Sequence, residues 1–263
     1  MFQIFNKSRY SMDIDLILTE LTAFKEKLPR QALEAAISRQ AEITPHLLAV
    51  LEAVAKNPLT RLDRPDFTLP EYALYLLAFF KEPKAFPLII KLFTTQDEDF
   101  IDTFGDFVTE DLCRVLASTY SGDLTPLNQL IESDNVDGFI RSAGLNAYVL
   151  LYLEGSISRS MVLAYFKELY EYKLVKEPSF IWDALICSSC DIHPNELMGH
   201  VSDAFGQDLI DLQIVNFESV QSTLDDALDK KLLRTQEMIG GYIGHPLEEL
   251  KHFERTDQES FDE

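Results

Sequence analysis

Residues 71–93 read EYALYLLAFFKEPKAFPLIIKLF, and this stretch determines the fold class that we expect. Its two halves are apolar at positions i, i+3, i+4 and i+7, the spacing that places side chains on one face of an α-helix. The polar break KEP separates them, and Pro83 opens the second half. Period-2 alternation, the signal for strands, is rare along the chain. The stretch therefore predicts an all-α protein built from pairs of antiparallel helices.

The Pro, Gly and Ser breaks between helical runs recur at a nearly constant spacing. Helix pairs are predicted to start near residues 44, 83, 122, 158 and 194, so successive starts lie 39, 39, 36 and 36 residues apart. HEAT and armadillo repeats have a period of about 40 residues. We therefore expect a right-handed α-solenoid of about five to six HEAT/armadillo-like helix pairs over residues 13–234. An irregular helical bundle is the alternative.

Both ends of the chain differ from this array. Residues 1–12 are expected to be an N-terminal extension, and 217–234 the last helix of the array. Residues 235–263 contain GGYIG, then LEELKHF, then a charged stretch. They predict a hinge, a short helix and a polar tail.

Three segments carry a resemblance to a known family: EYALYLLAFFKEPKAFPLIIKLF, IRSAGLNAYVLLYLEG and SFIWDALICSSCDIHPNEL. With these segments the chain resembles the bacterial domain-of-unknown-function family 1186. The resemblance implies a HEAT-like α-solenoid, and it implies no reaction and no functional residue. Some relatives look as though they carry a cysteine-rich metal-binding tail. No cysteine follows Cys190 in this chain, so we expect that module to be absent.

The composition bounds the partners and the compartment. A formal net charge of −21 argues against nucleic acid and against anionic membrane surfaces, because both attract Lys and Arg. No run approaches the roughly 18 apolar residues of a membrane span, and no apolar leader follows the N-terminus, where Met12 is an alternative start. Three cysteines, an odd number, do not make a disulfide framework. We therefore expect a cytoplasmic protein.

One segment raises the question of a metal site. Residues 186–200 contain four candidate ligands, Cys187, Cys190, His193 and His200. Structural zinc sites are tetrahedral, and ligands at i, i+3 and i+6 of one helix match that geometry poorly. A spacing of 36 residues also aligns Cys187 with Leu151, which lies in an apolar run. We therefore expect Cys187 to be buried in the core and no metal to be bound.

A second candidate set lies near the C-terminus, where His245, Glu249 and His252 are spaced to share one helix face. A His-Pro start followed by two Glu in the first turn is also how an ordinary helix begins. We interpret the segment as such a helix. The sequence thus predicts no metal, no other cofactor and no catalytic residue.

The acidic charge is concentrated in two blocks. Residues 92–140 hold eleven acids and one base, Arg114, and residues 177–229 hold eleven acids and no base. Equivalent positions of a solenoid project on the same side. The blocks therefore predict one acidic surface, interrupted near Lys167 and Lys173. Its candidate binding residues are Asp97, Asp99, Asp102, Asp106, Asp225, Asp226 and Asp229.

These patterns favour a non-enzymatic scaffold that binds a basic protein or peptide through the acidic surface. A metal-dependent or carboxylate-using enzyme on a helical-repeat scaffold is the alternative, and self-association is a third. An enzyme should show a pocket with convergent titratable groups. A scaffold should show a long open surface of one charge sign, although acidic blocks also serve solubility alone.

Overall fold

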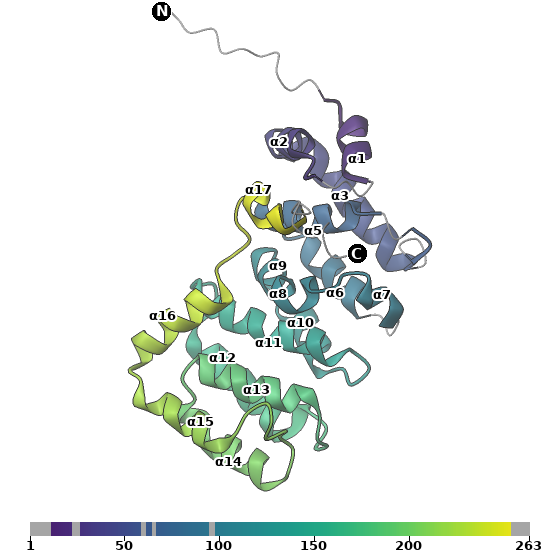
Figure 1. Ribbon diagram of the computed structural model, residues 1–263. Helices are drawn as coiled ribbons and strands as arrows, with labels where there is room; N and C mark the ends of the chain where they lie inside the picture. Colours follow the sequence, from purple (N-terminus) through teal and green to yellow (C-terminus); the bar gives the residue numbers. More distant parts are fainter. Residues whose placement is uncertain (1–11, 23–26, 59–61, 65–66, 95–97, 254–263) are drawn as a thin grey trace, which may run out of the picture.

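The computed structural model describes residues 12–22, 27–58, 62–64, 67–94 and 98–253, and its regular elements are helical (Figure 1). No β-strand occurs in these ranges, so the prediction of an all-α protein is confirmed. The expected N-terminal extension, apart from Met12, and the end of the polar tail lie outside the described residues.

Five helices begin within four residues of the predicted pair starts. They are α3 (Gln40–Lys56), α6 (Ala85–Phe93), α10 (Thr125–Glu132), α12 (Arg159–Glu168) and α14 (Met198–Gly206). We call them the first helices. An additional pair, α1 (Ile14–Thr22) and α2 (Arg30–Ser38), precedes them.

Each first helix is followed by a second helix. The second helices are α5 (Leu69–Phe79), α9 (Leu112–Ser118), α11 (Gly138–Leu153), α13 (Phe180–Asp191) and α15 (Phe217–Ser222). Two short helices, α7 (Glu98–Asp102) and α8 (Phe107–Glu110), lie between α6 and α9. Helix α5 packs against α9, α9 against α11, and α11 against α13, so these second helices form a continuous layer.

Local sequence explains several helix boundaries. Asp137 caps α11 by accepting hydrogen bonds from the amides of Phe139 and Ile140, which satisfies donors that have no partner inside the helix. Ser158 caps α12 in the same way. Helix α12 continues into a π-helical turn at Leu169–Lys173, which lengthens this unit.

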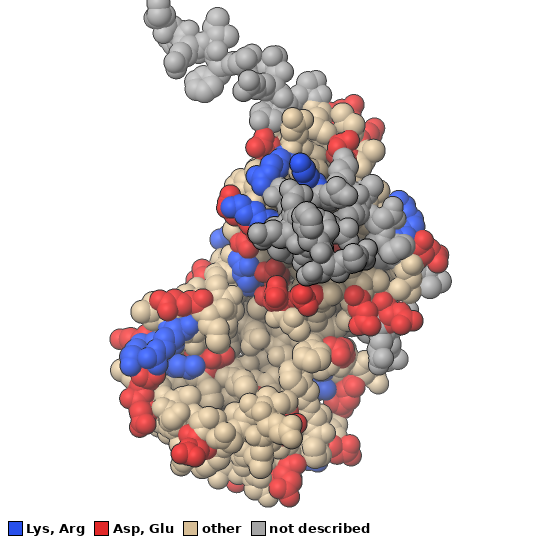
Figure 2. Space-filling model, in the orientation of Figure 1, with Lys and Arg blue, Asp and Glu red and all other residues tan. Residues whose placement is uncertain are grey.

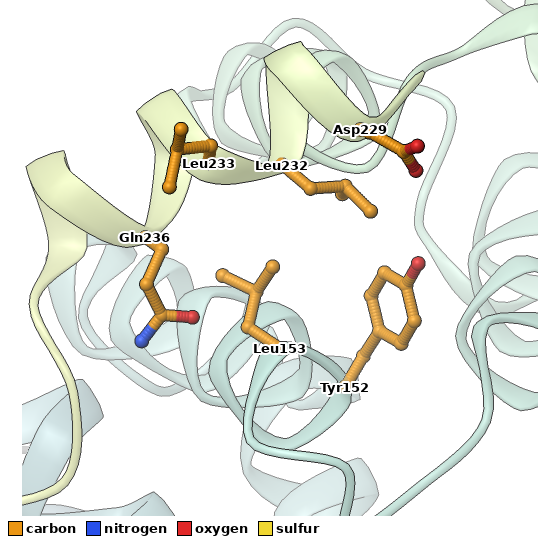
Figure 3. A pocket seen from close by; sticks show the side chains of 6 residues that line it. All are labelled: Tyr152, Leu153, Asp229, Leu232, Leu233 and Gln236. Carbon is orange, nitrogen blue, oxygen red and sulfur yellow. The ribbon is translucent and has the colours of Figure 1, made fainter.

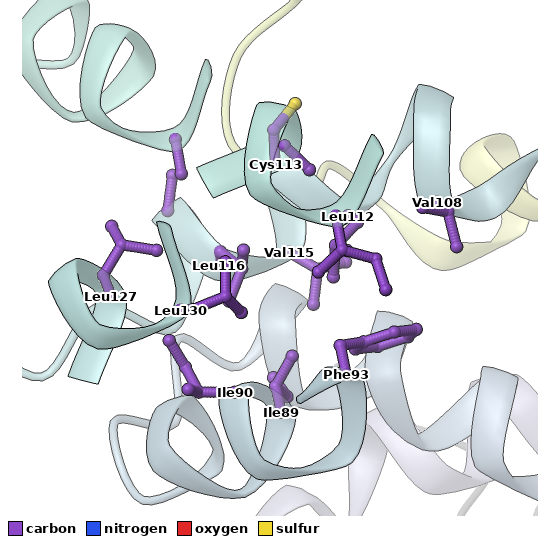
Figure 4. Close-up of a cluster of buried hydrophobic side chains, with 14 of the residues drawn as sticks. Ile89, Ile90, Phe93, Val108, Leu112, Cys113, Val115, Leu116, Leu127 and Leu130 are labelled. Atoms are coloured by element: carbon purple, nitrogen blue, oxygen red, sulfur yellow. The ribbon is translucent and has the colours of Figure 1, made fainter. Parts of the chain in front are cut away.

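The core is continuous between neighbouring pairs. Around α9, the side chains of Leu112, Val115 and Leu116 meet Ile89 and Phe93 from α6 and others from α8 and α10 (Figure 4). All five of these residues are at most 1% exposed. One helix pair cannot bury its apolar face alone, so each pair depends on its neighbours for stability.

The register between α11 and α13 corrects one prediction. The hydroxyl of Ser188 lies 3.3 Å from the side-chain oxygen of Asn146, a separation of 42 residues in the sequence. By this register Cys187 corresponds in position to Leu145 and not to Leu151, the residue that a spacing of 36 selects, although both leucines are buried. Cys187 is exposed, so the prediction that it is buried is wrong. Helix α11 is packed between α9 and α13, whereas α13 packs against α11 and α16 and has no comparable contact with α15, so α13 is less completely covered.

The segment after α15 also differs from the prediction. The expected last helix at 217–234 is divided, because α15 ends at Ser222 and α16 spans Leu228–Ile239. The chain then leaves α16 at Gly240, whose φ of 80° favours glycine, and forms α17 (Pro246–Glu249) and a 3₁₀ turn. We call residues 228–253 the C-terminal segment.

The C-terminal segment runs back along the array towards the N-terminus (Figure 1). Helix α16 packs against α11 and α13, whereas α17 packs against α2 and α5. At the end of α13, the buried Thr235 hydroxyl donates to the backbone carbonyl of Asp191, 3.0 Å away. Helix α17 thus contacts the pair formed by α1 and α2, at the opposite end of the array.

Candidate interaction surface

The C-terminal segment defines one edge of the second-helix layer. At the end of α9, the Ser118 hydroxyl accepts a hydrogen bond from the Ile243 amide at 2.8 Å. Just beyond α11, the Gln236 amide donates to the Glu154 carboxylate at 2.9 Å. Helices that end along one edge of a layer begin along the other, so the connections leading into the second helices lie on the opposite edge.

That opposite edge is rich in acids over the last four pairs. We define the acidic edge as the connections 98–106, 133–137, 174–179 and 207–216. Its exposed acids are Asp99, Asp102, Asp106, Asp134, Asp137, Glu177, Asp208 and Asp211. Lys176 is the single base in these connections. Its ammonium group donates to the Tyr170 carbonyl and lies 4.7 Å from the centroid of the Trp182 ring.

Some of these acids have structural partners. Asp137 caps α11, Asp134 pairs with Arg141 at 3.3 Å, and Asp211 accepts the amide of Gln213 at 2.9 Å. The others form no side-chain hydrogen bond or ion pair with described residues: Asp99, Asp102, Asp106, Glu177 and Asp208. No ion pair with a described residue therefore neutralises the charge of these five acids.

The remaining predicted acids lie elsewhere. Asp97 is outside the described residues. Asp225 and Asp226 lie just before the C-terminal segment and Asp229 lies in its first turn, so all three are away from the acidic edge. Asp226 pairs with Lys230 at 2.8 Å and with Arg234, and the hydrogen bond from Lys230 lowers the pKa of Asp226.

The sign of the surface charge therefore differs between the side that carries α16 and the side that carries the acidic edge. Figure 2 shows a group of Lys and Arg side chains at the left, over α16, and red side chains near α7 at the right. Lys231 of α16 also approaches Asp191, at 3.2 Å, while burial raises the pKa of Asp191. The chain's own basic helix thus neutralises part of the second acidic block.

A shallow groove of about 350 Å³ lies between α11 and α16 (Figure 3). Its walls are apolar, with Leu153 facing Leu232 and Leu233. Asp229 and Tyr152 lie at one end, and Gln236 at the other. The groove can receive an apolar side chain, but Asp229 is its only carboxylate, so acid–base chemistry has no paired group here.

A second pocket, of about 320 Å³, collects titratable groups around His200. The His200 ring stacks on Tyr170 at 5.9 Å, and its Nε2 atom lies 3.8 Å from the Glu171 carboxylate. Lys176 and Asp203 also line the pocket. Its walls come from the π-helical turn, α13 and α14. Because these three elements meet only in the folded chain, the sequence alone did not predict this pocket.

The predicted ligands near residue 190 are not brought together. Cys187 is exposed and Cys190 is buried, and burial raises the pKa of Cys190 to about 12, which disfavours the thiolate that binds metals. The backbone carbonyl of His193 accepts a hydrogen bond from Arg159 at 2.7 Å. Within the part of the chain that the structure describes, no three His, Cys, Asp or Glu side chains are placed to hold a metal ion.

The C-terminal candidates have other contacts. Both carboxylate oxygens of Glu249 accept hydrogen bonds from Arg114, at 2.7 and 2.9 Å. His245 accepts the amide of Leu247 through Nδ1 at 3.3 Å, and its ring packs edge-on against Phe79. The side chain of His252 lies outside the described residues. Glu249 therefore ties α17 to α9, a role that the sequence did not reveal.

Comparison with known proteins places this chain in a family. The model of a protein family of unknown function, DUF1186, matches residues 12–255. The chain belongs to the DUF1186 family. It is 37% identical over 233 residues to an uncharacterized protein of Chlamydia trachomatis, covering 87% of this chain and 92% of that protein. It is 38% identical over 253 residues to one of Chlamydia muridarum, covering 95% of this chain and all of that protein. No solved structure gives a significant match.

The DUF1186 match includes the acidic edge, both pockets and the C-terminal segment as far as the structure describes it. The return of α16 and α17 along the second helices therefore belongs to the family region. Among the described residues, no helix combines the length and apolar character needed to cross a bilayer.

Proposed function

We propose that this DUF1186 protein is a non-enzymatic α-solenoid scaffold that binds a basic segment of another protein through the acidic edge. The observation that carries the proposal is the set of eight exposed acids on four successive connections, accompanied by one lysine. Five of these acids form no ion pair or side-chain hydrogen bond within the described residues. Such a surface attracts Lys and Arg over distances of about a Debye length.

The arrangement of helices supports the solenoid interpretation. Helix pairs recur at the predicted starts, and α5, α9, α11 and α13 stack in chain order. Stacked pairs of this kind resemble HEAT and armadillo repeats. In such an array the connections into the second helices recur along one edge, which gives an elongated partner one long, predominantly acidic surface.

The alternative is a carboxylate-using enzyme, and one observation favours it. The pocket around His200 brings Glu171, Lys176 and Asp203 into one cavity. Two of its groups already have intramolecular partners, since Lys176 bonds to a backbone carbonyl and His200 stacks on Tyr170. These contacts support a structural role for the pocket, so we favour the scaffold.

Charge reversal at defined places tests the proposed function. In the edge variant, Asp99, Asp102 and Asp106 are replaced by Lys. In the matched control, Asp225, Asp229 and Glu237 are replaced by Lys, which changes the net charge equally at other exposed sites. Stopped-flow fluorescence then measures the association of a labelled lysine–serine peptide with each folded protein at low and high salt.

The edge variant should associate about tenfold more slowly than wild type at low salt, and high salt should remove the difference. The control should associate at a rate near that of wild type, because its charges lie away from the site. Equal slowing in both variants would show that only net charge matters, and it would refute the acidic edge as a binding site.

A further inference from the structure

Large exposed hydrophobic side chains gather beside the acidic edge. The described residues include nine such side chains, and four of them lie on its connections or one or two residues beyond. These four are Phe139 (52% exposed), Val175 (49%), Leu212 (67%) and Ile214 (50%). Together with the half-buried Phe180 they form what we call the edge patch. Scattered exposed hydrophobic residues are ordinary, whereas a cluster on one surface indicates an interaction site.

Direct contacts hold the three connections of the edge patch side by side. The rings of Phe139 and Phe180, at the starts of α11 and α13, lie 4.6 Å apart. One turn into α13, the Trp182 indole donates to the Val175 carbonyl at 3.0 Å. The neighbouring Asp183 carboxylate accepts the amide of Asp211, next to Leu212, at 2.8 Å.

These hydrogen bonds make the patch a preformed surface. Its backbone is fixed to α13, so binding requires little ordering of the chain and retains more of the interaction free energy. Figure 2 shows the region over the connection between α14 and α15 as largely uncharged, with red side chains around it.

The surrounding charge selects the occupant. Asp134, Asp137, Glu177, Asp208 and Asp211 are exposed on the same three connections. We propose that the edge patch docks a segment of another protein in which apolar side chains are interspersed with Lys and Arg. The apolar side chains fill the patch, and the basic ones meet the flanking acids. This inference rests on the proposed function and adds the requirement for apolar residues.

The charge also disfavours other occupants. A second copy of the chain carries the same net charge of −21 and is repelled. Anionic lipid and nucleic acid are repelled for the same reason. A basic, partly apolar segment is attracted by both features of the surface, and like-charged competitors are rejected.

Two synthetic peptides of equal length and charge test the inference. One carries lysines and leucines, and in the other each leucine is replaced by serine.

The patch variant of the protein combines Leu212→Ser with Ile214→Ser, both at exposed side chains, so its fold should persist. The control combines Met161→Ser with Met238→Ser, which removes exposed apolar side chains elsewhere (48% and 69% exposed). Fluorescence anisotropy gives each Kd, and circular dichroism verifies folding.

Wild type should bind the leucine peptide about tenfold more tightly than the serine peptide, because apolar area leaves water only in that complex. The patch variant should lose this preference and the control should keep it. Equal affinity of wild type for both peptides, or a preference that survives in the patch variant, overturns the inference while leaving the acidic edge as a binding site. Failure of both peptides to bind overturns the proposed function as well.

Discussion

Replacing Arg114 by methionine should release residues 240–253 while the helix array remains folded. Arg114 is the lone base of the first acidic block, and it joins α9 to α17. Its guanidinium contacts Glu249 at 2.7 Å and Asp111 at 2.7 Å, and it donates to the Gly241 carbonyl at 3.0 Å. Tyr75 completes the network by donating to Asp111 at 2.5 Å.

The magnitude follows from burial. The side chains of Arg114, Asp111 and Glu249 are 16%, 12% and 19% exposed. Removing one partner of a buried ion pair costs about 3–5 kcal/mol, because the remaining charge stays desolvated. Residual exposure in this network suggests the lower figure, about 3 kcal/mol. A loss of this size would raise the fraction of molecules in which residues 240–253 are locally unfolded by about two orders of magnitude.

Amide hydrogen exchange measures this directly. Residues 240–253 should exchange faster in Arg114→Met, whereas α9 and α11 should keep most of their protection. Arg234→Met is the control, since Arg234 is 57% exposed and pairs only on the surface. If exchange at 240–253 is unchanged in a folded Arg114→Met protein, the network does not hold the segment and the reasoning is wrong.

Two further predictions concern packing and pH. A methyl group at Gly144 would lie 2.7 Å from Ile131, so Gly144→Ala should lower the free energy of unfolding by about 1–3 kcal/mol. Gly199→Ala, a helical glycine with open space around it, should raise the same free energy by about 0.5–1 kcal/mol. Urea unfolding compares the two, and equal effects would contradict the close approach. Burial raises the pKa of the Asp183 carboxyl above its ordinary 3.8, so the folded state binds this proton more tightly than the unfolded state does. The contribution of Asp183 to the free energy of unfolding of wild type therefore falls as pH rises from 3.8 through the raised pKa. Asp183→Asn keeps an acceptor for Asp211 and should lack that fall when unfolding is measured between pH 4 and 7; an unaltered pH profile would contradict the assignment.

The helices and their starts were predictable because their signals are local. Apolar periodicity and the prolines, glycines and serines of the connections lie within a few residues of the boundaries they set. The residue of α11 that corresponds to Cys187 was not predictable from one period, because the units differ in length. First helices α10 and α12 start 34 residues apart, at Thr125 and Arg159, whereas contacting residues of α11 and α13 are 42 apart. The π-helical turn after α12 and the following connection take up the difference.

The surfaces were predictable only in part. Clusters of acids are visible in the sequence, but their partners are not, so Asp226 was indistinguishable from Asp99 until Lys230 and Arg234 were placed beside it. The tie between Arg114 and Glu249 joins residues 135 positions apart, and no local pattern encodes it. The same holds for the edge patch, which forms where three separate connections meet.

The contact of α17 with α2 and α5 has a consequence for synthesis of the protein in the cell. Open repeat arrays can fold from the first units onward as the chain emerges, and they can fray from either end. In this chain the pair formed by α1 and α2 can contact α17 only when residues 246–249 have left the ribosome. At about 5–20 residues per second, the early pairs wait on the order of ten seconds or more in an incomplete state. We therefore expect nascent chains that stop before α17 to depend on chaperones, and the finished protein to unfold more cooperatively than an open array of the same length.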